Sequence, residues 1–199
     1  MILNSEEQNF LFSIIKRSIE HGFKHDASLS IDPSTIDSKF KIISSVLVIL
    51  KYKNKIIGSS SIFDSSNIFY NALSKAGFKA AFRNEKYPEI NKNIINDTEI
   101  SFYILSDNKP VALIENIDDF CLRLKSTDSV IISCSDKKDY FLLEMQKEYE
   151  NVLLFMLALR ESAGIPKIIP WSYIKATTIS ATCSYSKLYK EITCQDSDS

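Results

Sequence analysis

The chain has 199 residues, of which 45% are hydrophobic, and its formal net charge is −1. A chain of this length buries roughly 70% of its unfolded surface, so it can form a domain without disulfides or structural metals. The near balance of 24 basic and 25 acidic residues argues against binding to nucleic acid or to an anionic membrane surface. With only 4 glycines, an open phosphate-binding loop is not expected.

The cysteines and the apolar runs indicate the compartment. Cys121, Cys134, Cys183 and Cys194 include no CxxC pair, which argues against a zinc knuckle. The start, MILNSEEQNF, lacks the basic and apolar regions of a signal peptide. The longest apolar run, Val152 to Leu159, is shorter than the ~20 residues of a membrane span. We therefore predict reduced, buried thiols at Cys121 and Cys134, a cytoplasmic location and no membrane partner.

The first half of the chain predicts two helices and a hairpin. Ser5 and Gln8 fit a capping box, and the apolar spacing that follows predicts a helix ending near Gly22. Two β-branched and apolar runs, 46–52 and 56–63, predict a hairpin. A second helix is expected from Ser65 or Ser66 to Phe82.

The second half predicts further strands and helices in alternation. Ile100, Phe102 and Ile104 alternate with polar residues in a strand over 99–105. A short helix over 116–123 and a hairpin of 130–133 with 140–143 come next. The helix over 151–163 is apolar nearly all round, so a central position is expected. A last strand over 174–181 and a frayed polar tail over 195–199 complete the pattern. These elements predict an α+β fold, with a mostly antiparallel sheet covered by helices.

Four stretches carry a resemblance to a known family. Residues 80–88 read AAFRNEKYP, and 99–106 read EISFYILS. Residues 56–61 read IIGSSS, and 162–166 read SAGIP, followed by Trp171. In order and spacing they are similar to the strings AAFRDPRFPP, LEIEVSVLS, LRGCIG and KAGLP of the AMMECR domain family. The resemblance covers roughly residues 5 to 190.

The resemblance implies a single domain over residues 1–199 with a larger lobe and a smaller second lobe around a shared cleft. It implies kinship with the A component of the three-protein AmmeMemoRadiSam system. A radical SAM protein and a Memo-type protein, which resembles a dioxygenase, are then the expected partners. A binding role follows from this association as readily as a catalytic one, and the residues indicate no oligomeric state.

The departures from the family strings fall on reactive positions. Gly58 is retained, but Ile57 replaces the motif's arginine and Ser59 its cysteine. Asn84 replaces an aspartate, and Lys86 replaces an arginine. The family's Cys-Arg-Lys before AGLP reads Arg-Glu-Ser at 160–162. Chemistry that needs a thiolate beside a guanidinium is therefore not expected in this chain.

Two residues are candidates for catalysis. Ser59 could act as a nucleophile if a general base lay within hydrogen-bond reach. The only histidines are His21 and His25, and the alternative is a small polar strand segment over 59–61. Glu99 could act as an acid or base, or orient Arg83, and is otherwise a solvated strand residue.

The binding candidates lie beside them. Arg83 and Lys86 suit an anion or a partner carboxylate, or they are cations at a helix C-terminus. A cleft is predicted from the residues Gly58, Ser59, Arg83, Asn84, Lys86 and Tyr87. No metal is expected at His21, His25 and Asp26, because Gly22 should break the helix that would align the two histidines and no third and fourth ligands are evident. No cofactor is expected either. We predict a partner- or ligand-binding component with an eroded reactive motif. The alternatives are an enzyme that modifies a protein or small molecule in the same cleft, and a paralogue with a structural role.

Overall fold

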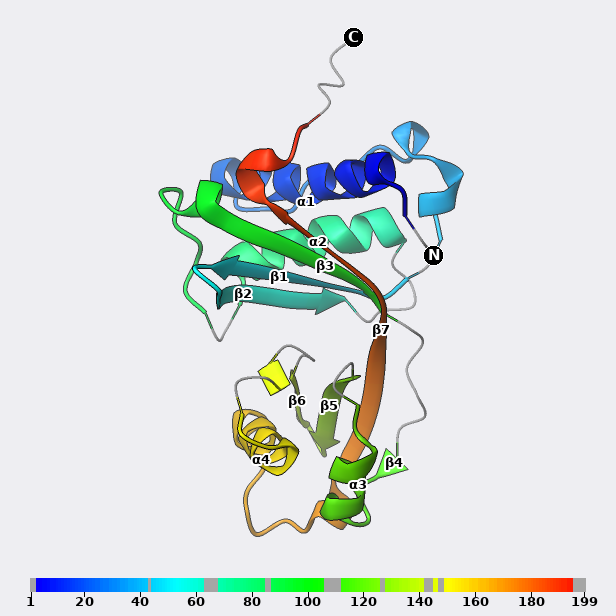
Figure 1. Cartoon of the computed structure of the whole chain (residues 1–199), viewed down its shortest axis with the longest axis vertical. Helices are drawn as coiled ribbons and strands as arrows, with labels where there is room; N and C mark the ends of the chain where they lie inside the picture. Colours follow the sequence, from blue (N-terminus) through cyan, green and yellow to red (C-terminus); the bar gives the residue numbers. More distant parts are fainter. Residues whose placement is uncertain are drawn as a thin grey trace. The chain divides into compact units, whose positions relative to one another are not determined.

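The computed structural model describes residues 3–42, 44–62, 68–84, 87–105, 112–125, 128–141, 145–146 and 149–194. The chain divides into two compact units (Figure 1). Unit 1 comprises Met1–Leu105 with Thr182–Ser199, and unit 2 comprises Ser106–Ala181. Antiparallel strands and helices build each unit, which confirms the predicted α+β class. No helix among the described residues is long and apolar enough to cross a bilayer.

Unit 1 holds a sheet with the strand order β2-β1-β3-β7. These strands are β1 (Val46–Tyr52), β2 (Lys55–Ile62), β3 (Thr98–Leu105) and the second half of β7 (Lys175–Leu188). Left-handed φ angles of 49° at Lys53 and 62° at Asn54 close the predicted β1–β2 hairpin. Figure 1 shows α1 (Ser5–His25) and α2 (Phe69–Phe82) together on one face of this sheet. Their apolar stripes and the alternate residues of β1 and β3 form the core, among them Leu11, Ile15, Val48, Leu50 and Phe102.

The first helix differs from its prediction at both ends. The capping box is formed by Asn4 and Glu7, one residue before the predicted pair. The helix continues past Gly22 to His25, and Asp26 ends it with φ of 54°. Gly22 is buried against α2, where an added Cβ would collide with the ring of Phe82. This glycine therefore allows α1 and α2 to pack closely. In the sequence alone, a glycine at this spacing looks like the end of a helix.

The C-terminal part of the chain completes unit 1. The Leu3 amide donates to the Tyr185 hydroxyl at 3.0 Å, and Lys16 Nζ donates to the Ile192 carbonyl at 2.9 Å. Tyr189 lies in the core and donates its hydroxyl to Glu20 at 3.2 Å. Burial raises the pKa of Tyr189 well above its usual range. The segment 183–192 is thus bound along α1.

Short 3-10 turns occur in both units, at Pro33–Thr35, Ser38–Phe40, Ile95–Asp97, Trp171–Tyr173 and Tyr189–Glu191.

Unit 2 pairs the first half of β7 with β5 (Asp128–Cys134) and with the short β4 (Ala112–Leu113). The predicted hairpin is confirmed as β5 with β6 (Lys137–Phe141), closed at Ser135 with φ of 56°. Asn116 caps the predicted short helix α3 (Ile117–Arg123), and Asn151 caps α4 (Val152–Ser162). The final strand, β7, is longer than predicted. The serines expected to cap α2, at 65 and 66, lie outside the described residues.

The prediction of a central position for α4 is wrong. Phe155, Met156 and Leu159 are buried, but Leu154 and Leu157 are each 42% exposed. An apolar run around a whole helix would be buried in a large core, whereas unit 2 covers only one side of α4. An apolar helix face therefore lies on the protein surface.

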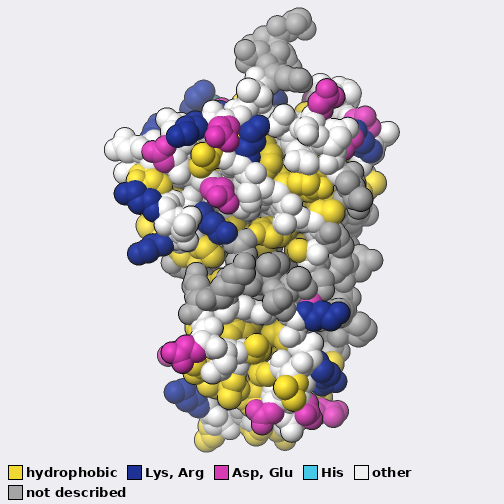
Figure 2. All heavy atoms as spheres, in the orientation of Figure 1, with side chains coloured by type: hydrophobic (Ala, Val, Ile, Leu, Met, Phe, Trp, Pro, Cys, Tyr) yellow, Lys and Arg dark blue, Asp and Glu magenta, His cyan; other side chains and the backbone are white. Residues whose placement is uncertain are grey.

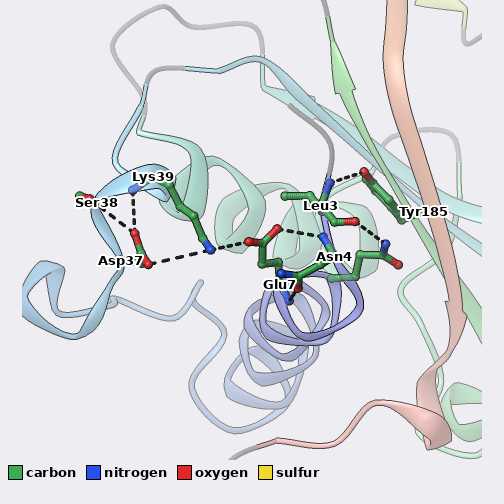
Figure 3. A network of polar contacts seen from close by, with 8 residues as sticks. Leu3, Asn4, Glu7, Asp37, Ser38, Lys39 and Tyr185 are labelled. Atoms are coloured by element: carbon green, nitrogen blue, oxygen red, sulfur yellow. Dashed lines mark hydrogen bonds and ion pairs between the residues drawn. The ribbon is translucent and has the colours of Figure 1, made fainter.

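An ion pair ties the start of α1 to the loop after it (Figure 3). Lys39 Nζ lies 2.5 Å from Glu7 Oε1 and 3.9 Å from Asp37 Oδ2, while Glu7 accepts from the Asn4 amide at 2.9 Å. The Lys39 hydrogen bond, followed by the Asn4 amide, lowers the pKa of Glu7, and the Glu7 hydrogen bond raises the pKa of Lys39. These groups are accessible to solvent, so the ion pair contributes little to the free energy of unfolding.

The lowered pKa of Glu7 predicts a pH dependence of stability. The carboxylate stabilises unit 1 above the ordinary glutamate pKa of about 4.3, and this contribution is lost as pH falls through the lower folded pKa. A Glu7→Gln variant should be less stable than the wild type at neutral pH, and the difference should shrink on acidification. Thermal unfolding followed by circular dichroism measures this. Glu6→Gln removes a charge from the same turn without touching the Lys39 hydrogen bond, so an equal effect there would contradict the assignment.

Candidate functional site

The packing of β2 against α2 explains why residue 58 is a glycine, which the sequence alone did not reveal. It pairs with Leu50 and faces α2, where an added Cβ would collide with the Ala80 carbonyl oxygen. The backbones of β2 and α2 therefore approach each other directly at this point. Gly58 is accordingly a packing position.

Ser59 and Asn84 come together, as the predicted cleft requires. Ser59 is 5% exposed, and the Asn84 side-chain amide donates to its backbone carbonyl. The same amide nitrogen lies 3.4 Å from the Ser59 hydroxyl. An amide N–H is a donor with no capacity to take up a proton, so it cannot activate the hydroxyl as a nucleophile. Asn84 instead pins β2, the edge strand of the sheet, to the segment after α2.

Arg83 has partners other than the predicted ones. Its guanidinium donates to the Asp26 carboxylate, to Glu89 at 3.3 Å and to the Phe82 carbonyl at 2.9 Å. It also lies over the Phe78 ring, 5.4 Å from the centroid. We call the group Asp26, Arg83 and Glu89 the Arg83 corner. It joins the C-terminal ends of α1 and α2, where a cation is favoured.

The Arg83 corner is nevertheless accessible. The Arg83 side chain is 42% exposed, and those of Asp26 and Glu89 are 73% and 69% exposed. Exposed ion pairs are worth at most about 1 kcal/mol, so a partner carboxylate or cation can displace either member. Tyr87 is half-buried in the same segment, and the predicted Lys86 lies outside the described residues.

Glu99 does not reach Ser59. The register places Ser59 opposite Ile49 and Ile49 opposite Ser101, so Ser59 and Ser101 are two strands apart. Strand spacing makes that about 10 Å, and Glu99 lies two residues further along β3. Glu99 is half-buried and accepts a hydrogen bond from Ser101 Oγ at 3.4 Å. It is therefore neither a general base for Ser59 nor the observed partner of Arg83.

The histidines and cysteines differ from their predictions in detail. His21 and His25 lie on one face of the unbroken α1, with ring centroids 4.4 Å apart. Within the described part of the chain, no three His, Cys, Asp or Glu side chains gather as metal ligands. Cys121 and Cys134 are half-buried and unbridged, where buried thiols were predicted. Partial burial, together with the nearby Asp118 charge, raises the pKa of the Cys121 thiol.

A groove in unit 2 was missed by sequence reasoning. It measures about 550 Å³ and lies between the outer face of α4 and the segment 164–167. Its walls include Leu154, Leu157, Ile165 and Pro166. We call it the α4 groove. The apolar run of α4 was a visible signal, but it was interpreted as core.

Arg160 fixes one wall of the α4 groove. It is 6% exposed, and its guanidinium donates to the carbonyls of Ile165 at 3.4 Å, Pro166, and Ile169 at 2.5 Å. It also lies 5.0 Å from the centroid of the Trp171 ring. One buried cation thus holds the chain from 165 to 171.

Comparison with known proteins supports the fold. The chain is similar to the crystal structure of the uncharacterized protein PH0010 from Pyrococcus horikoshii, with a TM-score of 0.78. The match covers 97% of each chain at 16% sequence identity. At this identity, the likeness establishes a shared fold. No protein-family model matches the chain, and no curated protein matches its sequence.

Proposed function

We propose that this chain is a divergent AMMECR-like domain that acts as a binding component, with a radical SAM protein or a Memo-type protein as its partner. The observation that carries the proposal is the state of Ser59. Ser59 is 5% exposed and its hydroxyl lies 3.4 Å from the Asn84 side-chain amide, at the position where the family string has a cysteine. A reactive centre there would need a base and access for a substrate.

The Arg83 corner is the surface we propose for the partner. The similarity of the strings at 80–88 and 99–106 to the family strings supports this choice, and the charged side chains of the corner are exposed. Arginine donates through a planar fork that matches a carboxylate, so an acidic group on the partner is the expected contact. Asp26 and Glu89 hold the Arg83 guanidinium in place until a carboxylate of the partner replaces one of them.

A pull-down with purified proteins tests the proposal. The radical SAM and Memo-type proteins of the same genome are expressed separately and passed over the immobilised chain. We expect one of them to bind the wild type, and Arg83→Glu to weaken that binding by about tenfold or more. Lys55→Glu is the matched control, because Lys55 is exposed at the start of β2 and the charge change is the same. Absence of binding by both proteins, or equal loss in both variants, would overturn the proposal.

A further inference from the structure

A second hollow of unit 2 lies where α3 meets the strands of the sheet. It measures about 280 Å³, and its described walls come from β4, α3, β5 and β7. Leu113, Phe120 and Leu124 make much of the lining apolar, and Thr178 contributes a hydroxyl. Pockets for drug-sized ligands measure roughly 300–1,000 Å³, so this hollow suits a smaller molecule. We call it the α3 pocket.

A buried acidic residue lines the α3 pocket. Asp128 begins β5 and is 1% exposed. It pairs with Ser180, so the strand pleat places its side chain on the same sheet face as that of Thr178. One carboxylate oxygen accepts from the Lys125 amide at 3.2 Å. A carboxylate can accept about four hydrogen bonds through its two oxygens, so Asp128 can also accept from a ligand ammonium.

A basic residue lines the same pocket. Arg123 is exposed in the last turn of α3, and its Nε donates to the Asp119 carbonyl at 3.2 Å. This bond leaves the two terminal nitrogens of the guanidinium, whose planar fork matches a carboxylate. Both Arg123 and Asp128 belong to the described residues, and they form no ion pair with each other. Two opposite charges therefore line one small pocket without neutralising each other directly.

We propose that the α3 pocket binds a small zwitterion, an aliphatic α-amino acid. The ammonium of the ligand binds Asp128, its carboxylate binds the Arg123 fork, and its side chain packs against Leu113, Phe120 and Leu124. A ligand with one charge would satisfy only one of the two protein charges, and an uncharged ligand neither. Figure 2 shows the same mixture on the surface of unit 2, where hydrophobic side chains lie beside acidic and basic ones.

Calorimetric titration of the full chain with leucine, isoleucine and valine tests the proposal. At least one of the three should bind. Isocaproate is leucine without its ammonium, and isopentylamine is leucine without its carboxylate. Each should bind at least about tenfold more weakly than leucine, because one charge-assisted contact is lost. Absence of binding by all three amino acids, or equal affinity of leucine and either analogue, would overturn the proposal.

Variants of the two charged residues test their roles. Arg123→Met and Asp128→Asn should each raise the dissociation constant of the bound amino acid by about tenfold or more. Asparagine still offers an oxygen to the Lys125 amide, and circular dichroism checks that both variants fold. Lys167→Met is the matched control, because it removes one exposed positive charge from the same unit outside the α3 pocket. A folded Arg123→Met that binds as tightly as the wild type, or an equal loss in Lys167→Met, would overturn the proposal.

Discussion

A Gly58→Ala variant is expected to lose about 3 kcal/mol of the unfolding free energy of unit 1. The added methyl group would meet the Ala80 carbonyl oxygen, which belongs to the α2 backbone. Backbone cannot rotate aside as a side chain can, so β2 or α2 must shift and disturb the buried contacts around Leu50. Urea unfolding followed by circular dichroism measures the loss.

Ser60→Ala is the control for this variant. Ser60 is the next residue but one after Gly58 on the same strand, is 8% exposed and pairs with Val48. Alanine adds no atom there, so a loss well below that of Gly58→Ala is expected. Equal losses would show that the strand itself, and not the close approach at Gly58, determines the effect.

An Arg160→Met variant is expected to destabilise unit 2 by about 3 kcal/mol. Methionine fills part of the volume but leaves the carbonyls of Ile165, Pro166 and Ile169 without their donor. The Pro166 carbonyl keeps the Ile169 amide as a donor, but three hydrogen bonds from a charged group are lost, and each is worth on the order of 1 kcal/mol or more. Trp171 is the sole tryptophan and lies against Arg160, so its fluorescence reports this part of the unit directly.

Arg123→Met separates the loss of these contacts from the loss of a charge. Arg123 is an exposed arginine at the end of α3, where its Nε donates to the Asp119 carbonyl at 3.2 Å. A surface substitution of this kind usually changes stability by about 0.5 kcal/mol or less. If Arg160→Met had a similarly small effect, Arg160 would not be holding the 165–171 segment.

Much of the fold could be predicted because periodicity records which side of an element is buried. The alternation of Ile100, Phe102 and Ile104 identified the core face of β3, and all three lie in the core of unit 1. The position of Gly22 could not be predicted in this way. A glycine that ends a helix and a glycine that admits a neighbouring ring are the same letter, and the Phe82 ring comes from a distant part of the sequence.

The candidate site was predictable in its membership but not in its contacts. The family resemblance placed Ser59 and Asn84 in one predicted cleft, and the two residues lie together in the structure. It could not predict that Arg83 pairs with Asp26 and Glu89. Asp26 lies beside Arg83 because α1 continues past Gly22 to His25. The exposure of Leu154 and Leu157 was likewise beyond prediction, since composition shows that a helix is apolar without showing what covers it.

The most direct test of the central claim is the affinity of the purified chain for the proposed partner, a radical SAM or Memo-type protein, measured for the wild type, Ser59→Ala and Arg83→Glu. If the chain is a binding component, the wild type should form a complex and Ser59→Ala should bind with unchanged affinity. Arg83→Glu should lower the affinity by about tenfold or more. Calorimetry gives all three values under one set of conditions. A chain that binds neither protein, or one in which Ser59→Ala abolishes binding or a turnover while Arg83→Glu does not, would contradict the account.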